Sequence, residues 1–303
     1  MRAPRRTEMG GGMIGLGVTN LEQDWPQMTH YRVWDIGVTW RDIHLAPGVY
    51  NWDRLDAVIA KAERHAGHIL YTFGACPQWL AKYPDQPHYA PWLGPGSNSM
   101  PYDMTIAGHF IRELTTRYRG RINAYEIWNE PQLADFLYPW NDAERNALAA
   151  LTRKAYDIIE SIDPQAMVLA ASVLPRDSSG GMNRGKKYWE ALKRKGWPVD
   201  AFTCHLYPEI GTGAKRWKAM LDDVMGTLAT MNAPTKKMWI TEMAYGLLGP
   251  DIPDDKASQL VRDTYAWDGG RFTYWYAWDR RDLGGMYIGP GSEAWTAIKR
   301  ESG

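Results

Sequence analysis

Cysteine is nearly absent from this sequence, and long apolar runs are absent altogether. Only two cysteines occur among 303 residues, so no disulfide framework can form. No apolar run approaches the roughly 20 residues that span a bilayer, which excludes a membrane-spanning helix. Residues 1–20 are basic but have no sustained apolar stretch, so we expect no secretory leader. Localisation therefore stays open between the cytoplasm and export, either with the leader trimmed or by another route.

The sequence also has no excess of charge of either sign. Lys+Arg and Asp+Glu number 35 each, so the chain lacks the excess of basic residues expected of a nucleic-acid-binding protein. Neither H-x-H nor H-E-x-x-H occurs, which argues against a metal-dependent hydrolase. The early glycines do not spell G-x-G-x-x-G, so a dinucleotide cofactor is not indicated either. We expect no metal and no organic cofactor.

Two aromatic residue types are abundant instead. The chain has 16 Trp and 17 Tyr against only 5 Phe. Trp and Tyr combine a flat apolar face with a hydrogen-bonding edge, which suits a surface that binds an amphipathic ligand such as a sugar. Most of these rings must nevertheless pack in the core, so the composition only hints at a carbohydrate partner.

Short β-rich runs alternate with amphipathic stretches along the whole chain. Nearly continuous apolar runs predict buried parallel strands. Amphipathic patterns predict helices between them, for example over 52–67, 142–164 and 214–228, with Asp142 as the N-cap of the second. The strands are expected at 12–18, 31–37, 68–74, 122–128, 167–173, 200–207, 238–244 and 272–278.

This alternation, repeated eight times without a linker, predicts one (β/α)8 TIM barrel over residues 1–303. A doubly wound open sheet is the alternative. Cys76 and Cys204 fall on nearly opposite strands of such a barrel, too far apart for a disulfide, and are expected to be free thiols. We expect a monomer.

Two glutamates end strands of the predicted barrel. Glu130 follows the fourth strand and Glu242 the seventh. Side chains at the carboxyl ends of barrel strands face the active site. A pair of carboxylates there is what glycoside hydrolysis requires: one protonates the leaving oxygen, and the other attacks the anomeric carbon or activates water.

The surrounding motifs resemble clan A of the glycoside hydrolases, which are retaining (β/α)8 enzymes. AYEIWNEP is similar to the strand-four acid/base signature, and WITEMAYG to the nucleophile strand. Four further segments resemble other strands of the clan: 31–56 resembles strand two, CPQWLA strand three, CHLYP strand six and WYAWD strand eight. In character the set is closest to family 39 and family 5 enzymes. The resemblance implies that Glu130 is the general acid/base and Glu242 the nucleophile. It also implies that Asn129 binds the sugar 2-hydroxyl.

The same resemblance suggests roles for other rim residues. Tyr207 would hold Glu242 ionised, while His205, two positions earlier on the same strand face, could contact substrate or support the rim. Arg32 could support the nucleophile or belong to a buried ion pair. Trp278 could form the floor under the reacting sugar. Trp40 and Trp79 could line the cleft or plug the barrel top.

The sequence therefore predicts a retaining glycoside hydrolase without cofactors, acting on a β-linked oligo- or polysaccharide. Aromatic residues in the long loops after strands three and four favour several sugar subsites; they are Tyr89, Trp92, Tyr102, Phe136, Tyr138 and Trp140. Two alternatives remain open: a transglycosylase that uses the same site, and a carbohydrate-binding barrel without catalysis.

Overall fold

Eight parallel strands close into a barrel in the computed structural model, which describes residues 14–175, 181–208, 213–234, 237–246, 250–268 and 272–302. Their order around the barrel is β1-β10-β9-β8-β7-β6-β5-β2, and β2 pairs back with β1. The strands are β1 (Ile14–Val18), β2 (His30–Val33), β5 (His68–Phe73), β6 (Ala124–Ile127), β7 (Met167–Leu169), β8 (Ala201–Leu206), β9 (Lys237–Met243) and β10 (Phe272–Trp275). The predicted (β/α)8 fold is confirmed, with every predicted strand present.

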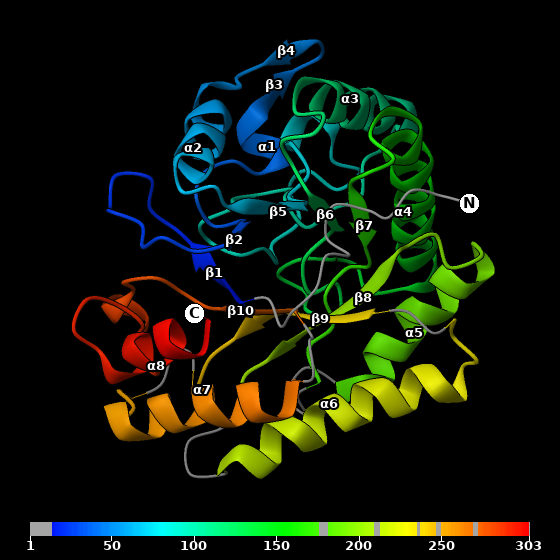
Figure 1. The fold of residues 1–303 in the computed structure, drawn as a ribbon. Coiled ribbons are helices and arrows are strands. Elements are labelled where there is room, and N and C mark those ends of the chain that lie inside the picture. Colours follow the sequence, from blue (N-terminus) through cyan, green and yellow to red (C-terminus); the bar gives the residue numbers. More distant parts are fainter. Residues whose placement is uncertain are drawn as a thin grey trace.

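Helices surround these strands as an outer ring (Figure 1). They are α1 (Trp40–Ile43), α2 (Asp53–Arg64), α3 (Met104–Arg117), α4 (Asp142–Ile162), α5 (Gly181–Arg194), α6 (Gly213–Thr230), α7 (Asp254–Asp268) and α8 (Glu293–Ser302). A small hairpin, β3 (His44–Ala46) and β4 (Val49–Tyr50), and two 3₁₀ turns, η2 (Gln78–Leu80) and η4 (Arg281–Leu283), lie in the loops.

The helices bury the apolar faces that their sequence periodicity predicts. In α2, Leu55, Val58, Ile59 and Ala62 are fully buried against the barrel. The start of α4 differs by one residue from the prediction. Its N-cap is Asn141, whose side-chain oxygen accepts a hydrogen bond of 2.9 Å from the Glu144 amide, so Asp142 is the first helical residue.

The barrel interior is layered, with polar residues above apolar ones. The lower layer is a separate apolar cluster made of Leu70, Ala124, Met167, Leu169, Ala201, Trp239 and Tyr274. Two positions further along three of these strands come Thr72, Glu126 and Thr241. Because strand side chains alternate with a period of two, these three polar residues form the next layer toward the carboxyl ends. The polar layer directly supports the site described below.

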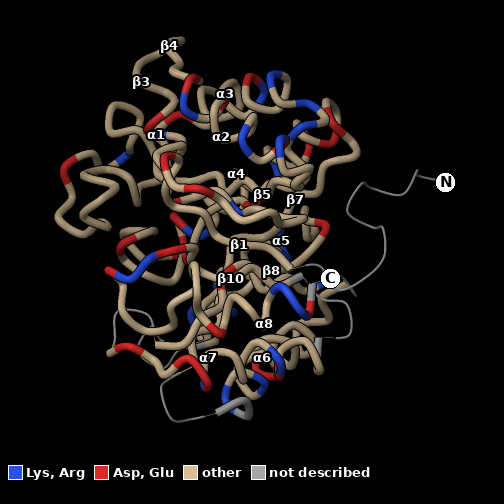
Figure 2. Tube along the Cα trace, turned by 60° about the vertical axis from the view of Figure 1, so that its left-hand side comes forward, with Lys and Arg blue, Asp and Glu red and all other residues tan. Residues whose placement is uncertain are grey.

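The outer surface carries charges of both signs. Figure 2 shows acidic and basic residues interspersed along the helices and loops around the barrel. Within the described residues, no helix is long and apolar enough to cross a membrane. Cys76 and Cys204 are buried thiols that form no disulfide, as predicted.

Candidate active site

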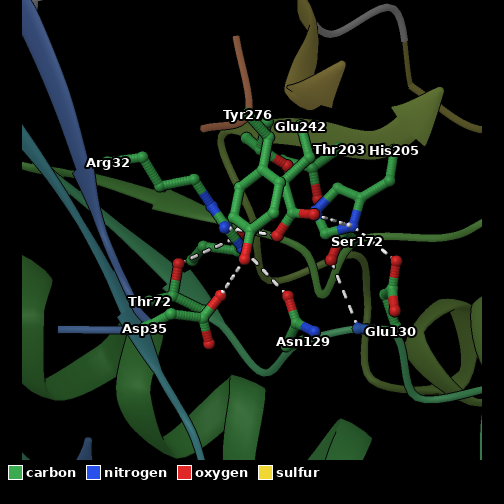
Figure 3. Close-up of polar contacts among 12 residues, drawn as sticks. Arg32, Asp35, Thr72, Asn129, Glu130, Ser172, Thr203, His205, Glu242 and Tyr276 are labelled. Carbon is green, nitrogen blue, oxygen red and sulfur yellow. Dashed lines mark hydrogen bonds and ion pairs between the residues drawn. The ribbon is translucent and has the colours of Figure 1, made fainter. Parts of the chain in front are cut away.

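Asn129 and Glu130 lie on an irregular turn directly after β6. Trp128 and Glu130 have positive φ values of 85° and 36°, a conformation that costs non-glycine residues about 1–3 kcal/mol each. The Trp128 indole N–H donates to the carbonyl of Phe136 at 2.6 Å, and its amide donates to Phe73 at 2.7 Å. The Glu130 amide donates to Ser172 Oγ at 3.3 Å. These contacts hold the turn so that Asn129 and Glu130 face the barrel mouth (Figure 3).

Glu242 projects from β9 and accepts hydrogen bonds at both carboxylate oxygens. Arg32 Nη1 donates to Oε1 at 2.5 Å, and the Tyr207 hydroxyl donates to Oε2. The side chain is 8% exposed, so these donors act in a site that is largely free of water. The predicted contact between Tyr207 and Glu242 is present.

His205 brings the two glutamates together. Its Nδ1 atom lies 2.7 Å from Oε1 of Glu130 and 3.4 Å from Oε2 of Glu242. One carboxylate oxygen of each glutamate and the His205 nitrogen all lie within 4.8 Å of one another. The β8–β9 register shifts between Cys204 and His205, a bulge of the kind that re-aims side chains next to active sites.

Burial shifts the pKa values of Glu242 and His205. Burial raises the pKa of Glu242, as do the neighbouring Glu130 and Asp35 carboxylates, and His205 and Arg32 only partly oppose this shift. The expected donors are therefore in place, but they do not bring the Glu242 pKa below its ordinary value. Burial also lowers the pKa of His205 to about 4, so the imidazole is neutral at neutral pH.

Arg32 links Glu242 to a second buried acid, Glu126. Arg32 Nε and Nη2 donate to Glu126 Oε2 at 3.1 and 2.9 Å, and Nη2 also reaches Asn129 Oδ1 at 2.9 Å. Burial disfavours the charge on Glu126, yet Arg32 and its other partners offset this, so its pKa lies below the ordinary range. Arg32 therefore contacts Glu242 and is also half of a buried ion pair with Glu126, so it combines the two arrangements left open above.

Glu126 is a residue that the motif analysis did not select. Its Oε2 also accepts from Thr72 Oγ1 at 2.9 Å, and its Oε1 from Thr241 Oγ1 at 2.7 Å. The sequence did contain a signal for Glu126, since it is an acidic residue inside an otherwise apolar strand. A charge buried in this way requires hydrogen-bond or ion-pair partners.

The Glu130–His205–Glu242 group has donor types that can also bind a metal ion. Here the same atoms are hydrogen-bonded: His205 to Glu130, and Arg32 and Tyr207 to Glu242. The Arg32 guanidinium supplies a positive charge at the place where a cation would bind Glu242. The arrangement fits a hydrogen-bonded carboxylate pair better than a metal centre.

The carboxylates open into a cleft of about 460 Å³ at the carboxyl ends of the strands. It is lined by Trp34, Asp35, Trp92, Asn129, Glu130, Leu133, Asp135, Phe136, Leu174, Tyr207, Glu242, Tyr276, Arg280 and Leu283. Of the aromatic loop residues singled out in the sequence, Trp92 and Phe136 line this cleft. Trp34, Asp35 and Tyr276 are further lining residues that the sequence analysis did not select.

None of the three tryptophans considered for the cleft is among its lining residues. Trp40 is fully buried between β5 and α3, where its ring packs on Phe73 and Phe110 at 5.0 and 5.7 Å. Trp79 packs edge-on against His44 in the same region and donates to its carbonyl at 3.0 Å.

The expected floor residue, Trp278, is likewise not among the residues that line the cleft. It donates to the Asp24 carbonyl at 2.9 Å and packs against Trp295 of α8 at 5.0 Å. Tyr276, two positions earlier, lines the cleft instead. The expectation was wrong because contacts distant in sequence, at Asp24 and Trp295, set the direction of this side chain.

The fold and this site define a (β/α)8 barrel with paired carboxylates at its mouth. No family model and no curated protein matches the chain.

Solved structures do match it. A monomeric β-xylosidase from Caulobacter crescentus CB15 is 17% identical with a TM-score of 0.73, over 95% of this chain and 67% of that one. An endo-1,4-β-xylanase from Caldicellulosiruptor owensensis is 13% identical with a TM-score of 0.65, over 95% and 96%. A GH10 structure from Paenibacillus barcinonensis is 14% identical with a TM-score of 0.62, over 95% and 94%. At these identities the similarity establishes the fold.

Proposed function

We propose that the chain, as one catalytic domain over residues 1–303, is a retaining glycoside hydrolase that cleaves β-linked sugars. The observation that carries this proposal is the closeness of Glu130 and Glu242: a carboxylate oxygen of one lies within 4.8 Å of a carboxylate oxygen of the other. Retaining glycosidases hold their carboxyl groups about 5–5.5 Å apart, whereas inverting enzymes need about 6.5–9.5 Å to admit a water.

In the first step, an oxygen of Glu242 attacks the anomeric carbon while Glu130 gives its proton to the departing glycosidic oxygen. The bond from carbon to that oxygen breaks, and a covalent glycosyl-enzyme forms. In the second step, the Glu130 carboxylate takes a proton from water, the water oxygen bonds to the anomeric carbon, and Glu242 leaves as a carboxylate.

We infer that Asn129 binds the 2-hydroxyl. Asn129 lines the cleft, and because its Oδ1 accepts from Arg32, its amide NH₂ group is the part that can donate to a substrate. A hydrogen bond to the 2-hydroxyl strengthens as the oxocarbenium-like transition state forms, so this contact would accelerate both steps.

The similar structures suggest the first substrates to test. Because those structures include a β-xylosidase and xylanases, xylosides and xylan come first, followed by β-glucosides. Proton NMR of the reaction mixture distinguishes the anomers of the first product. We expect the β-anomer to form first and then to equilibrate, and initial formation of the α-anomer would overturn the retaining mechanism.

A transglycosylase would share the first step and differ only in the acceptor. Adding a sugar or alcohol acceptor distinguishes the two activities, since a transglycosylase makes the transfer product as its main product. A carbohydrate-binding barrel would bind the same ligands without turnover.

A further inference from the structure

Asp35 is a further, partly buried carboxyl group in the cleft, and the mechanism above does not use it. It follows β2 by two positions, and it lines the cleft together with Glu130 and Glu242. Its Oδ2 accepts a hydrogen bond of 2.6 Å from the Tyr276 hydroxyl (Figure 3). Its Oδ1 is buried, and no described residue donates to it.

A buried carboxylate oxygen without a donor is costly, because it has lost water and gained no partner. Burial accordingly raises the pKa of Asp35, although Tyr276 and Arg32 oppose the shift. A site that holds such an oxygen in a fixed direction favours a ligand that brings a donor to it, and it rejects an analogue without that donor.

Tyr276 fixes Asp35 beside the nucleophile. The Tyr276 ring packs edge-on against Tyr207 at 6.5 Å, and Tyr207 donates to Glu242. Asp35 is therefore part of the cleft wall, next to the residues that contact Glu242.

The charges of the cleft indicate which donor this is. Asp35, Glu130, Asp135 and Glu242 all line it, and Arg280 at its edge is held by Asp282 through two contacts of 2.8 Å. Such a cleft disfavours a sugar that carries a carboxylate or sulfate group, because like charges repel in a poorly solvated site. A neutral sugar brings a hydroxyl group as the donor.

We propose that Asp35 is a specificity-determining residue that accepts a hydrogen bond from a ring hydroxyl of a neutral sugar. The hydroxyl is other than the 2-hydroxyl, which Asn129 takes. This inference rests on the proposed function for the position of the anomeric carbon at Glu242.

The test compares 4-nitrophenyl β-D-xyloside, or the β-D-glucoside if that is turned over faster, with its 3-deoxy and 4-deoxy analogues. For the wild-type protein, we expect one of the two analogues to lose at least about 10-fold in kcat/KM. Asp35→Ala should lose about 10- to 100-fold on the parent substrate and nothing further on that analogue. Asp222→Asn, an exposed change on α6, is the matched control and should behave as wild type.

Equal losses for Asp35→Ala on all three substrates would overturn the inference, because Asp35 would then act only through the fold or through Tyr276. Tyr276→Phe checks that route: it leaves Asp35 Oδ1 in place, so it should keep the discrimination against the deoxy analogue. If Asp35→Ala fails to fold, Asp35→Asn keeps the side-chain shape and changes the acceptor to an amide, and it should still reduce the discrimination.

Binding separates this inference from the proposed function. NMR titration with methyl β-D-xyloside, methyl β-D-glucoside and their deoxy analogues requires no turnover. Binding that depends on Asp35 and on one hydroxyl, without hydrolysis, would contradict the proposed function and support the inference. Failure of the wild-type protein to bind either glycoside would overturn the inference.

Discussion

Nδ1 of His205 lies 2.7 Å from Oε1 of Glu130. Because the imidazole is neutral at neutral pH, it carries one proton, and we assign that proton to Nδ1. Nε2 is buried without an acceptor among the described residues, so a proton there would be left without a partner. His205 therefore donates to Oε1 of Glu130. In the proposed mechanism, the proton that Glu130 transfers is then carried by Oε2.

Glu130→Ala should separate the two chemical steps. With a nitrophenolate leaving group, departure needs little protonation, so the first step should survive in part. The second step lacks its general base, so the glycosyl-enzyme should accumulate as a burst of nitrophenolate, and added azide should restore turnover as a β-glycosyl azide. Natural substrates with poor leaving groups should lose about 10²–10⁴-fold, as measured by kcat/KM.

The control for this variant is Glu113→Ala, which removes an exposed carboxylate on α3 and should leave all rates unchanged. Equal losses on good and poor leaving groups for Glu130→Ala, with neither a burst nor an azide effect, would remove Glu130 from the acid/base role.

Tyr207→Phe should move the acid limb of the pH profile to higher pH. The phenol donates to the Glu242 carboxylate and so stabilises its charged form; without it, the already raised pKa of Glu242 rises further. The nucleophile must be ionised, so activity is lost as the pH falls through this pKa. We expect the acid limb of kcat/KM to shift upward by about one to two units, since hydrogen bonds to charged groups contribute about 1.5–3 kcal/mol.

Tyr102→Phe, at a position that is 61% exposed, is the matched control for the loss of a phenol and should leave the profile in place. An unchanged acid limb in Tyr207→Phe, or one displaced to lower pH, would show that the Tyr207 hydroxyl does not stabilise the ionised nucleophile.

Trp278→Ala should damage folding and leave the chemistry of the remaining folded protein intact. The side chain is 6% exposed and packs on Trp295, so its truncation should reduce the free energy of unfolding by about 3–5 kcal/mol. Denaturant unfolding measures this loss. A normal unfolding midpoint together with a large fall in kcat would instead place Trp278 at the reacting sugar.

Trp92→Ala should have the opposite effect. Trp92 lines the cleft and is 67% exposed, so its removal exposes no core. Stacking on an aromatic face contributes about 0.5–1.5 kcal/mol, which corresponds to a loss of about 2- to 10-fold in kcat/KM on oligosaccharides. The thermal midpoint should stay unchanged, and equal kcat/KM for the variant and wild type on every chain length would exclude Trp92 from binding.

The barrel and its carboxylate pair could be predicted from the sequence because each depends on local patterns. Apolar strand runs placed Glu130 and Glu242 at strand ends, and closure of the barrel brings strand ends to one mouth. Side-chain directions in the loops depend on partners that the local pattern does not contain. Trp278 is turned by Asp24 and Trp295, and Asp35 is held by Tyr276 from 241 positions away.

Covalent labelling of Glu242 tests the central claim most directly. A 2-deoxy-2-fluoro glycoside with a good leaving group forms the glycosyl-enzyme but slows its hydrolysis, because the electronegative fluorine destabilises the positive charge of both transition states. After proteolysis, mass spectrometry should find one added fluorosugar on the peptide that contains Glu242, with loss of activity in the same proportion. Hydrolysis of ordinary glycosides without such a label, or a label carried by another residue, would contradict the account.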